Sequence, residues 1–180
     1  MTASVLTVAF SEQRTSELEA LVLRARGGDT EAYGDLVERT WSDLVALARG
    51  MLGGDAEAED LVQEALVHAW KRLWMLRQPE KVEAWLRRIV ARRCLSWARR
   101  RRPQELPPET AGSASDPAAG LDAARLLQTL APRQRAVLYL TWIEGCTDKE
   151  AGGILGIRPA TIRVHRFRGM QILRRLVREQ

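Results

Sequence analysis

Apolar residues in this 180-residue chain recur at the spacing of α-helices. Between residues 60 and 76 they follow one another at steps of four and three, at Val62, Leu66, Ala69, Leu73 and Leu76. Such steps place the side chains on one face of a helix, where they can pack against a core. The sequence lacks the short alternating runs with hairpin signals that indicate strands. The pattern predicts an all-α protein.

Glycine, proline and aspartate mark the expected ends of these helices. Gly-Gly-Asp occurs twice, at residues 27–29 and 53–55, where glycine can end one helix and aspartate can cap or complement the next. The expected helices are Glu17–Arg26, Thr30–Leu52, Ala56–Leu76, Val82–Arg101 and Asp122–Leu130, then one opening at Pro132, one at Thr147 and a basic one at Pro159.

A segment without apolar periodicity separates two groups of helices. Residues 103–120, PQELPPETAGSASDPAAG, have the composition of a flexible linker. We therefore expect two small helical domains, residues 17–102 and 121–180, joined by this linker. Residues 1–16 are expected to form a flexible N-terminal tail.

The C-terminal domain carries the pattern of a helix-turn-helix. Thr147 and Glu150 form a capping box, and about eight residues later a turn at Gly156 leads into the basic helix. The first part of such a second helix enters the DNA major groove, with Ile162 turned to the core. The candidate DNA contacts are Arg158, Ala160, Thr161, Arg163, Val164 and Arg168; a small helical bundle with a solvated basic face remains an alternative.

The net charge of +5 hides a segregation of charge along the chain. Residues 12–64 hold 13 acidic and 5 basic residues, a net charge of −8. Residues 84–102 hold eight Arg and no acid, and residues 157–180 hold seven Arg and one Glu. This distribution favours a polyanion that is contacted by particular surfaces.

Arginine is interleaved with tryptophan in the first basic stretch. Trp85 and Trp97 lie among its arginines, and Trp74 lies just upstream. Flat rings and positive charge suit single-stranded nucleic acid, whose unstacked bases need partners for stacking. The alternative is that Trp85 and Trp97 are core residues and that the arginines at 99–102 are a solvated tail.

The acidic helix that precedes this stretch has a polar face of its own, which would repel DNA and therefore suits a protein partner. That face carries Asp60, Gln63, Glu64, Val67 and Lys71. Glu64 and His68, four residues apart, lack further metal ligands nearby, so we expect no metal site and no cofactor. Because no nucleophile and base, phosphate loop or carboxylate pair is recognisable, we expect no enzyme activity.

The two cysteines and the hydropathy indicate the cell compartment. Cys94 and Cys146 stand alone inside apolar helical patterns, where they are expected to be buried small apolar residues. No apolar run reaches the roughly 18 residues of a membrane span, and the N-terminus lacks a signal-peptide layout. A cytoplasmic, reduced protein is expected.

Two segments resemble a known family when they are taken together and in order. The stretches DAEAEDLVQEALVHAWK (55–71) and AWLRRIVARRCLSWARRRR (84–102) resemble region two of the extracytoplasmic-function (ECF, group 4) sigma factors of bacterial RNA polymerase. Residues 130–177, with CTDKEAGGILGIRPATIRVHRFR at their centre, resemble region four. The resemblance covers roughly residues 18–177.

The resemblance implies a sigma factor that directs core polymerase to promoters. Region two would bind core polymerase through Asp60, Gln63, Glu64 and Lys71. It would read the melted minus-ten element through Trp74, Arg92, Arg93, Ser96, Trp97, Arg99 and Arg100, with residues 74–81 as a loop that could hold a flipped base. Region four would read the duplex minus-thirty-five element through Thr161, Arg163 and their neighbours. Family members are commonly held inactive by an anti-sigma protein.

Five residues depart from the family pattern. Gly152-Gly153 is expected to loosen the first helix of the motif. Arg158 replaces the usual Ser or Thr cap, Arg166 replaces a packing leucine, and Arg92 replaces a frequent Asn. Two rival functions therefore stay open: a helix-turn-helix regulator that acts without polymerase, and a sigma-like interaction module that no longer initiates.

Overall fold

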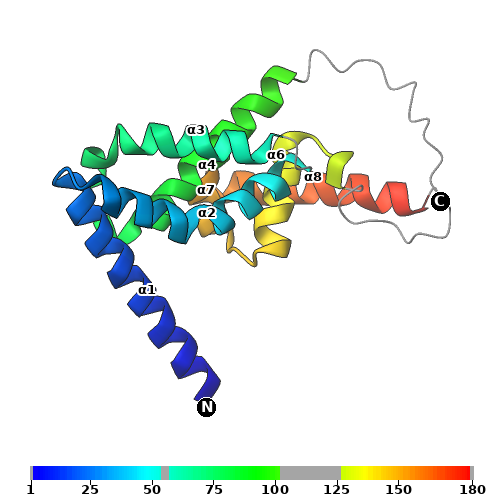
Figure 1. Ribbon diagram of the computed structural model, residues 1–180. Coiled ribbons are helices and arrows are strands. Elements are labelled where there is room, and N and C mark those ends of the chain that lie inside the picture. The colour runs from blue at the N-terminus through cyan, green and yellow to red at the C-terminus, as the bar shows by residue number, and fades with distance from the viewer. Residues whose placement is uncertain (1, 54–56, 102–126, 179–180) are drawn as a thin grey trace, which may run out of the picture.

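The computed structural model describes residues 2–53, 57–101 and 127–178, in which all regular secondary structure is helical (Figure 1). This confirms the predicted fold class. The predicted linker, residues 103–120, and most of the helix expected at Asp122–Leu130 lie outside the described residues. Within the described ranges, no helix combines the length and apolar character that a membrane crossing requires.

The described part of the N-terminal domain is built from α-helices and two 3-10 turns. These are α1 (Thr2–Arg26), α2 (Thr30–Leu52), α3 (Ala58–Trp70) and α4 (Val82–Arg101), with 3-10 turns η1 (Leu73–Met75) and η2 (Pro79–Lys81) between α3 and α4. The C-terminal domain contains α6 (Pro132–Leu138), the π-helical turn η3 (Tyr139–Ile143), α7 (Asp148–Leu155) and α8 (Pro159–Arg178).

Helices α2 and α4 begin and end at the residues that the sequence predicted. Asp29 caps α2 by accepting a hydrogen bond from the Ala32 N–H at 3.0 Å, and Gly53 ends it with a left-handed φ of 76°. The Gly53 N–H donates to the Arg49 carbonyl, so both ends pair backbone groups that a helix otherwise leaves unpaired.

Two predicted boundaries were wrong. Helix α1 begins at Thr2 rather than Glu17. The first 16 residues contain neither Gly nor Pro, so they extend the helix whose later turns pack against the core. Helix α3 ends at Trp70 rather than Leu76, and the chain turns through η1 before Pro79. The turn still buries Leu73 and Leu76, which explains why their spacing looked helical.

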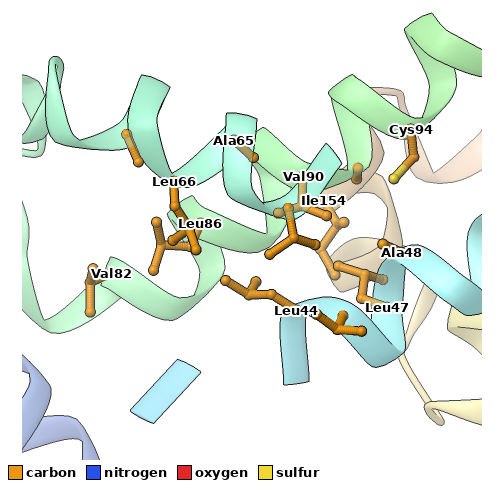
Figure 2. Close-up of a cluster of buried hydrophobic side chains, with 14 of the residues drawn as sticks. Leu44, Leu47, Ala48, Ala65, Leu66, Val82, Leu86, Val90, Cys94 and Ile154 are labelled. Carbon is orange, nitrogen blue, oxygen red and sulfur yellow. The ribbon is translucent and has the colours of Figure 1, made fainter. Parts of the chain in front are cut away.

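The core lies where α2 meets α1, α3 and α4. Leu36, Leu44 and Leu47 of α2 are almost fully buried, as are Leu86 and Val90 of α4. Ile154 of α7 joins the same cluster, so the second domain contributes to the core of the first (Figure 2). Burial of this apolar surface is the main term that stabilises the fold.

The two domains pack against each other where the aromatic ring of Tyr139 lies against Gly50. The ring of Tyr139 lies so close to Gly50 of α2 that a Cβ there would lie 1.9 Å from it, and the Tyr139 hydroxyl donates to the Ala46 carbonyl at 3.1 Å. Arg135 donates to the carbonyl of Leu52, and partly buried Arg87 and Glu144 form an ion pair. The described residues thus form one closed body.

Candidate nucleic-acid interface

Helix α3 presents a polar face to solvent. Its opposite side is buried in the core, and Asp60, Gln63 and Glu64 are exposed. Lys71 is also exposed but lies just beyond the helix end, since α3 is shorter than predicted. Val67 is 52% exposed between these polar residues. A face that combines carboxylates with one apolar side chain suits a protein partner better than DNA.

The acidic face borders directly on the basic helix α4. Arg93 of α4 forms an ion pair with Glu64 at 2.5 Å, and Arg101 pairs with Glu57. The sequence had assigned Glu64 and Arg93 to different partners, and the structure brings them together. These pairs orient the long arginine side chains along the seam between α3 and α4.

The candidate minus-ten residues of α4 divide by burial. Arg92, Arg99 and Arg100 are exposed, whereas Arg93 and Ser96 are partly buried. Exposed guanidinium groups can contact phosphates, and the less exposed positions can contact a base that approaches closely.

The tryptophans take different positions. Trp85 and Trp97 are partly buried and pack against the core, and the guanidinium carbon of Arg101 lies 4.9 Å from the centre of the Trp97 ring. Trp74, in the turn after α3, is 70% exposed. Of these three rings, Trp74 therefore offers most of its surface for stacking on a base.

A groove of about 470 Å³ runs between the end of α3, η1 and α4. Cationic side chains surround an apolar wall, and the lining residues are His68, Arg72, Met75, Trp85, Ile89, Arg92, Arg93, Ser96 and Arg100. Partial burial and then the charges of Arg72, Arg93 and Lys71 lower the pKa of His68. The neutral imidazole is thus favoured, and it can both donate and accept a hydrogen bond.

Helices α7 and α8 form the predicted helix-turn-helix. The Thr147 hydroxyl donates to Glu150 at 2.7 Å, and Gly156 turns the chain with φ 68°. Gly152 also meets a packing need that helix propensity does not show, because a Cβ at Gly152 would lie 2.7 Å from the Ile157 carbonyl. Only glycine permits this approach of the turn, whereas Gly153 faces open space.

The first part of α8 exposes most of the candidate minus-thirty-five residues. Ile162 is fully buried as predicted, Thr161 is partly buried, and Ala160, Arg163 and Val164 are exposed, as is Arg158 just before the helix. Asp148 of α7 pairs with Arg166 and lies 3.7 Å from Arg163. Arg166, which replaces a packing leucine in the family pattern, thus ties α8 to α7.

Arg168 stands apart from the other candidate minus-thirty-five residues. It lines a cleft between the two domains together with Arg92 and Arg99 of α4. The structure therefore groups Arg168 with the minus-ten candidates. The helical spacing alone did not reveal this, because it depends on how the domains pack.

The cysteines follow the predicted apolar pattern in part. Cys94 is buried in the core, and its burial raises the pKa of its thiol to about 12. Cys146 is only partly buried. The buried Cys94 thiol therefore stays protonated and behaves as a small apolar residue.

Both domains match models of known protein families. Residues 36–104 match Sigma-70 region 2, and residues 121–173 match Sigma-70, region 4. The chain is 33% identical over 167 residues to the ECF RNA polymerase sigma factor SigF of Caulobacter vibrioides, which covers 88% of this chain and 92% of that protein. The chain is an extracytoplasmic-function sigma factor. The order of its two regions and the near-complete coverage of SigF place this RNA polymerase sigma factor in the family.

Other relatives of this sigma factor differ in length and sequence. It is 29% identical to the probable RNA polymerase sigma factor RfaY of Xanthomonas campestris, matching 77% of this chain but only 38% of that protein. Among solved structures, the sigma factor RpoE in its complex with the anti-sigma factor NepR from Bartonella quintana superposes with a TM-score of 0.61. That likeness, at 24% identity, covers 81% of this sigma factor and 96% of RpoE, and supports the fold.

Proposed function

We propose that this sigma factor binds core RNA polymerase through α3 and reads two promoter elements through α4 and α8. The observation that carries the proposal is the division of charge in the fold. An acidic exposed face on α3 lies beside an arginine-rich α4, and a second arginine-rich helix forms part of a helix-turn-helix. A protein partner and a polyanion would thus meet separate faces of the molecule.

The polymerase contact would use Asp60, Gln63, Glu64 and Lys71. The three α3 residues lie on one exposed face opposite the buried seam, so a partner can reach them without unfolding the helix. Exposed Val67 adds an apolar contact at the centre of this face. Charged residues at the rim would steer the encounter, and the apolar centre would contribute affinity.

The melted minus-ten strand would lie along the groove beside α4. Arg92, Arg99 and Arg100 would hold phosphates, and the partly buried Arg93 and Ser96 would donate to a base edge. Trp74 would stack on an unpaired base, while Trp97 supports α4 from within. The groove volume of about 470 Å³ suits a single flipped base with its sugar.

The minus-thirty-five duplex would receive the first turns of α8 in its major groove. Arg163 would donate two hydrogen bonds to a guanine, and Ala160 and Val164 would contact thymine methyl groups. Thr161 would also face the bases, and Arg158 would contact the backbone beside them. The Asp148 carboxylate, 3.7 Å from Arg163, would restrict the side chain before DNA binds.

The closed packing of the domains must open for both elements to be read. The two elements lie about 25 base pairs apart by their names, which at 3.4 Å per base pair is about 85 Å. In the closed body, α4 packs against α6 and α7, so α8 is far nearer to α4 than the DNA requires. The proposed work of this sigma factor is therefore binding and domain movement, without chemistry of its own.

An anti-sigma protein would act by keeping the domains closed. The RpoE structure holds a sigma factor with the anti-sigma factor NepR, and we propose a partner of that kind for this chain. A protein that contacted both domains at once would stabilise the Tyr139 and Arg87 contacts between them. It would then withhold α4 and α8 from DNA by mass action.

Run-off transcription tests this function. Purified core polymerase, with and without this chain, would be given a library of promoter sequences. Selective initiation that depends on the chain is the expected result. DNA binding without initiation would favour a regulator that acts without polymerase, and no DNA binding at all would favour an interaction module.

Reversing the charge of Asp60 and Glu64 to Lys should abolish association with core polymerase. The change places two cations where the proposed interface needs anions, and like charges at an interface are strongly unfavourable. Association would be measured by pull-down of core polymerase, with folding checked by circular dichroism. The matched control reverses exposed Asp35 and Glu38 of α2. Equal loss in the control, or retained binding in the test variant, contradicts the proposed polymerase face.

A further inference from the structure

A cleft of about 600 Å³ separates α4 from α6 and α8. Its walls come from both domains: Arg92 and Arg99 from α4, Arg133 from α6, and His165 and Arg168 from α8. Leu95 and Leu155 add apolar lining. The cleft is thus distinct from the groove beside α3, although Arg92 and Ser96 contribute to both.

The cleft concentrates positive charge without a counter-charge. None of its lining residues is acidic, and among the described residues none of its four guanidinium groups forms an ion pair. Other arginines of the same helices are paired: Arg93 with Glu64, and Arg166 with Asp148. Closing the domains therefore brings unpaired like charges together, and a bound anion would offset their repulsion.

Neutral hydrogen-bonding groups line the cleft together with the cations. Partial burial, followed by the charges of Arg133 and Arg168, lowers the pKa of His165. Ser96 and Gln134 also line the cleft. The side-chain Oε1 of Gln134 accepts from the Ala131 N–H at 3.2 Å, which leaves the side-chain NH₂ as a donor. Guanidinium, hydroxyl and amide donors around one space are the groups that bind phosphate oxygens.

We propose that this cleft binds a small phosphate-rich anion, a free oligophosphate or nucleotide, that holds the two domains together. The volume lies within the range of small-molecule sites and is far too small to enclose duplex DNA. Because cations from both domains converge on the space, one ligand with several phosphates would contact both walls at once. Its binding would favour the closed body over the open one.

The ligand would act as an inhibitor of promoter binding. Arg92 and Arg99 are among the residues proposed to hold the minus-ten strand, so this consequence rests on the proposed function. An anion in the cleft would occupy the same guanidinium groups and would oppose the domain separation that promoter recognition needs. Binding of the anion and of promoter DNA would be mutually exclusive, with reciprocal effects on affinity.

Titration calorimetry of the full chain with sodium tripolyphosphate at about 150 mM salt tests the proposal. We expect saturable binding of one anion per chain. Arg133→Ala should weaken it about tenfold, the scale of one charge-assisted hydrogen bond, and Arg133→Lys should restore part of it. The matched control is Arg174→Ala, which removes an exposed charge on α8 that does not line the cleft. It should leave the affinity within about twofold, a change well below that of one lost charged hydrogen bond.

An independent readout is the titration of His165 by NMR, whose pKa should rise when tripolyphosphate is present. A single-stranded oligonucleotide without promoter sequence forms the second arm. Binding of the oligonucleotide without saturable tripolyphosphate binding would overturn the proposal, as would equal losses in Arg133→Ala and Arg174→Ala. Neither result would affect run-off transcription without the anion, so failure here is distinguishable from failure of the sigma function.

Discussion

Helices α4 and α8 look alike in sequence but hold opposite positions in the fold. Each is 20 residues long and rich in arginine, and each is proposed to bind DNA. Helix α4 buries five residues between α2, α3 and the second domain, whereas α8 buries only Ile162 and Gly169. One basic helix is thus a central structural element, and the other is a surface element.

This difference separates two ways of contacting DNA. Helix α8 can place its exposed first turns in a groove with little change elsewhere, which suits reading of an intact duplex. Helix α4 offers only its rim and a groove beside it, which suits single bases that come out of a duplex. Changes at the buried positions of α4 should therefore disturb the fold, and changes at the exposed positions of α8 should disturb recognition alone.

The largest effect is expected from Leu86→Ala in α4. Leu86 is 1% exposed, so the change leaves a cavity in the core and should lower the free energy of unfolding by about 2–5 kcal/mol. Val177→Ala on α8, where Val177 is 53% exposed, should change it by less than about 0.5 kcal/mol. Urea unfolding measures both, and similar losses in the two variants would break the contrast.

Arg163→Ala in α8 should weaken binding to the minus-thirty-five duplex by about 1–3 kcal/mol. The variant removes a proposed base contact from an exposed side chain, so the free energy of unfolding should stay unchanged. Fluorescence anisotropy would compare the cognate duplex with a scrambled one. Arg178→Ala, in the last turn of α8, is the control. Equal weakening on both duplexes would show a phosphate contact in place of base reading.

Gly50→Ala should open the molecule. Within a helix, Gly→Ala normally stabilises by roughly 0.5–1 kcal/mol, but here the methyl group would collide with the Tyr139 ring. Gly34→Ala, at a position in α2 with nothing within 4 Å, should give the ordinary gain without opening. Small-angle scattering should show a larger radius of gyration for Gly50→Ala alone, and Gly50→Ala combined with Tyr139→Ala should restore closure. An unchanged radius would contradict the closed packing.

The smallest effect concerns the start of the helix-turn-helix. Hydrogen bonds from the Thr147 hydroxyl and N–H hold the pKa of Glu150 below its ordinary 4.5. A lowered pKa means that this contact stabilises the fold above pH 4.5 and is lost as the pH falls through the folded value. Thr147→Ala should raise the pKa of Glu150 towards its ordinary value. Carboxyl NMR titration measures the shift, and identical titrations in both proteins would refute the capping box.

Local patterns predicted the elements and failed where tertiary contacts decide. Asp29 and Gly53 fixed α2, and the Thr147 box with Gly156 fixed the helix-turn-helix, because caps and turns depend on neighbours in sequence. The end of α3 was missed because Leu73 keeps its buried position in a 3-10 turn. Apolar spacing alone does not distinguish these two backbones.

The site was predicted as separate faces, and the structure joins some of them. Spacing placed Glu64 and Arg93 on different helices but could not show that they pair. Arg168 was assigned to the minus-thirty-five contacts, and domain packing makes it line the same cleft as Arg92. The fit of Tyr139 against Gly50 links residues far apart in sequence, so no local signal predicts it. The sequence supplied the chemistry of the site, and packing determines which groups meet.

The most direct test of the account is to sequence the promoters selected by core polymerase together with this chain. The account predicts two separate blocks of preferred sequence. Arg163→Ala should relax preference only in the upstream block, and Ser96→Ala should relax it only in the downstream block. If one block is selected, or if both variants change the same block, α4 and α8 do not read separate promoter elements.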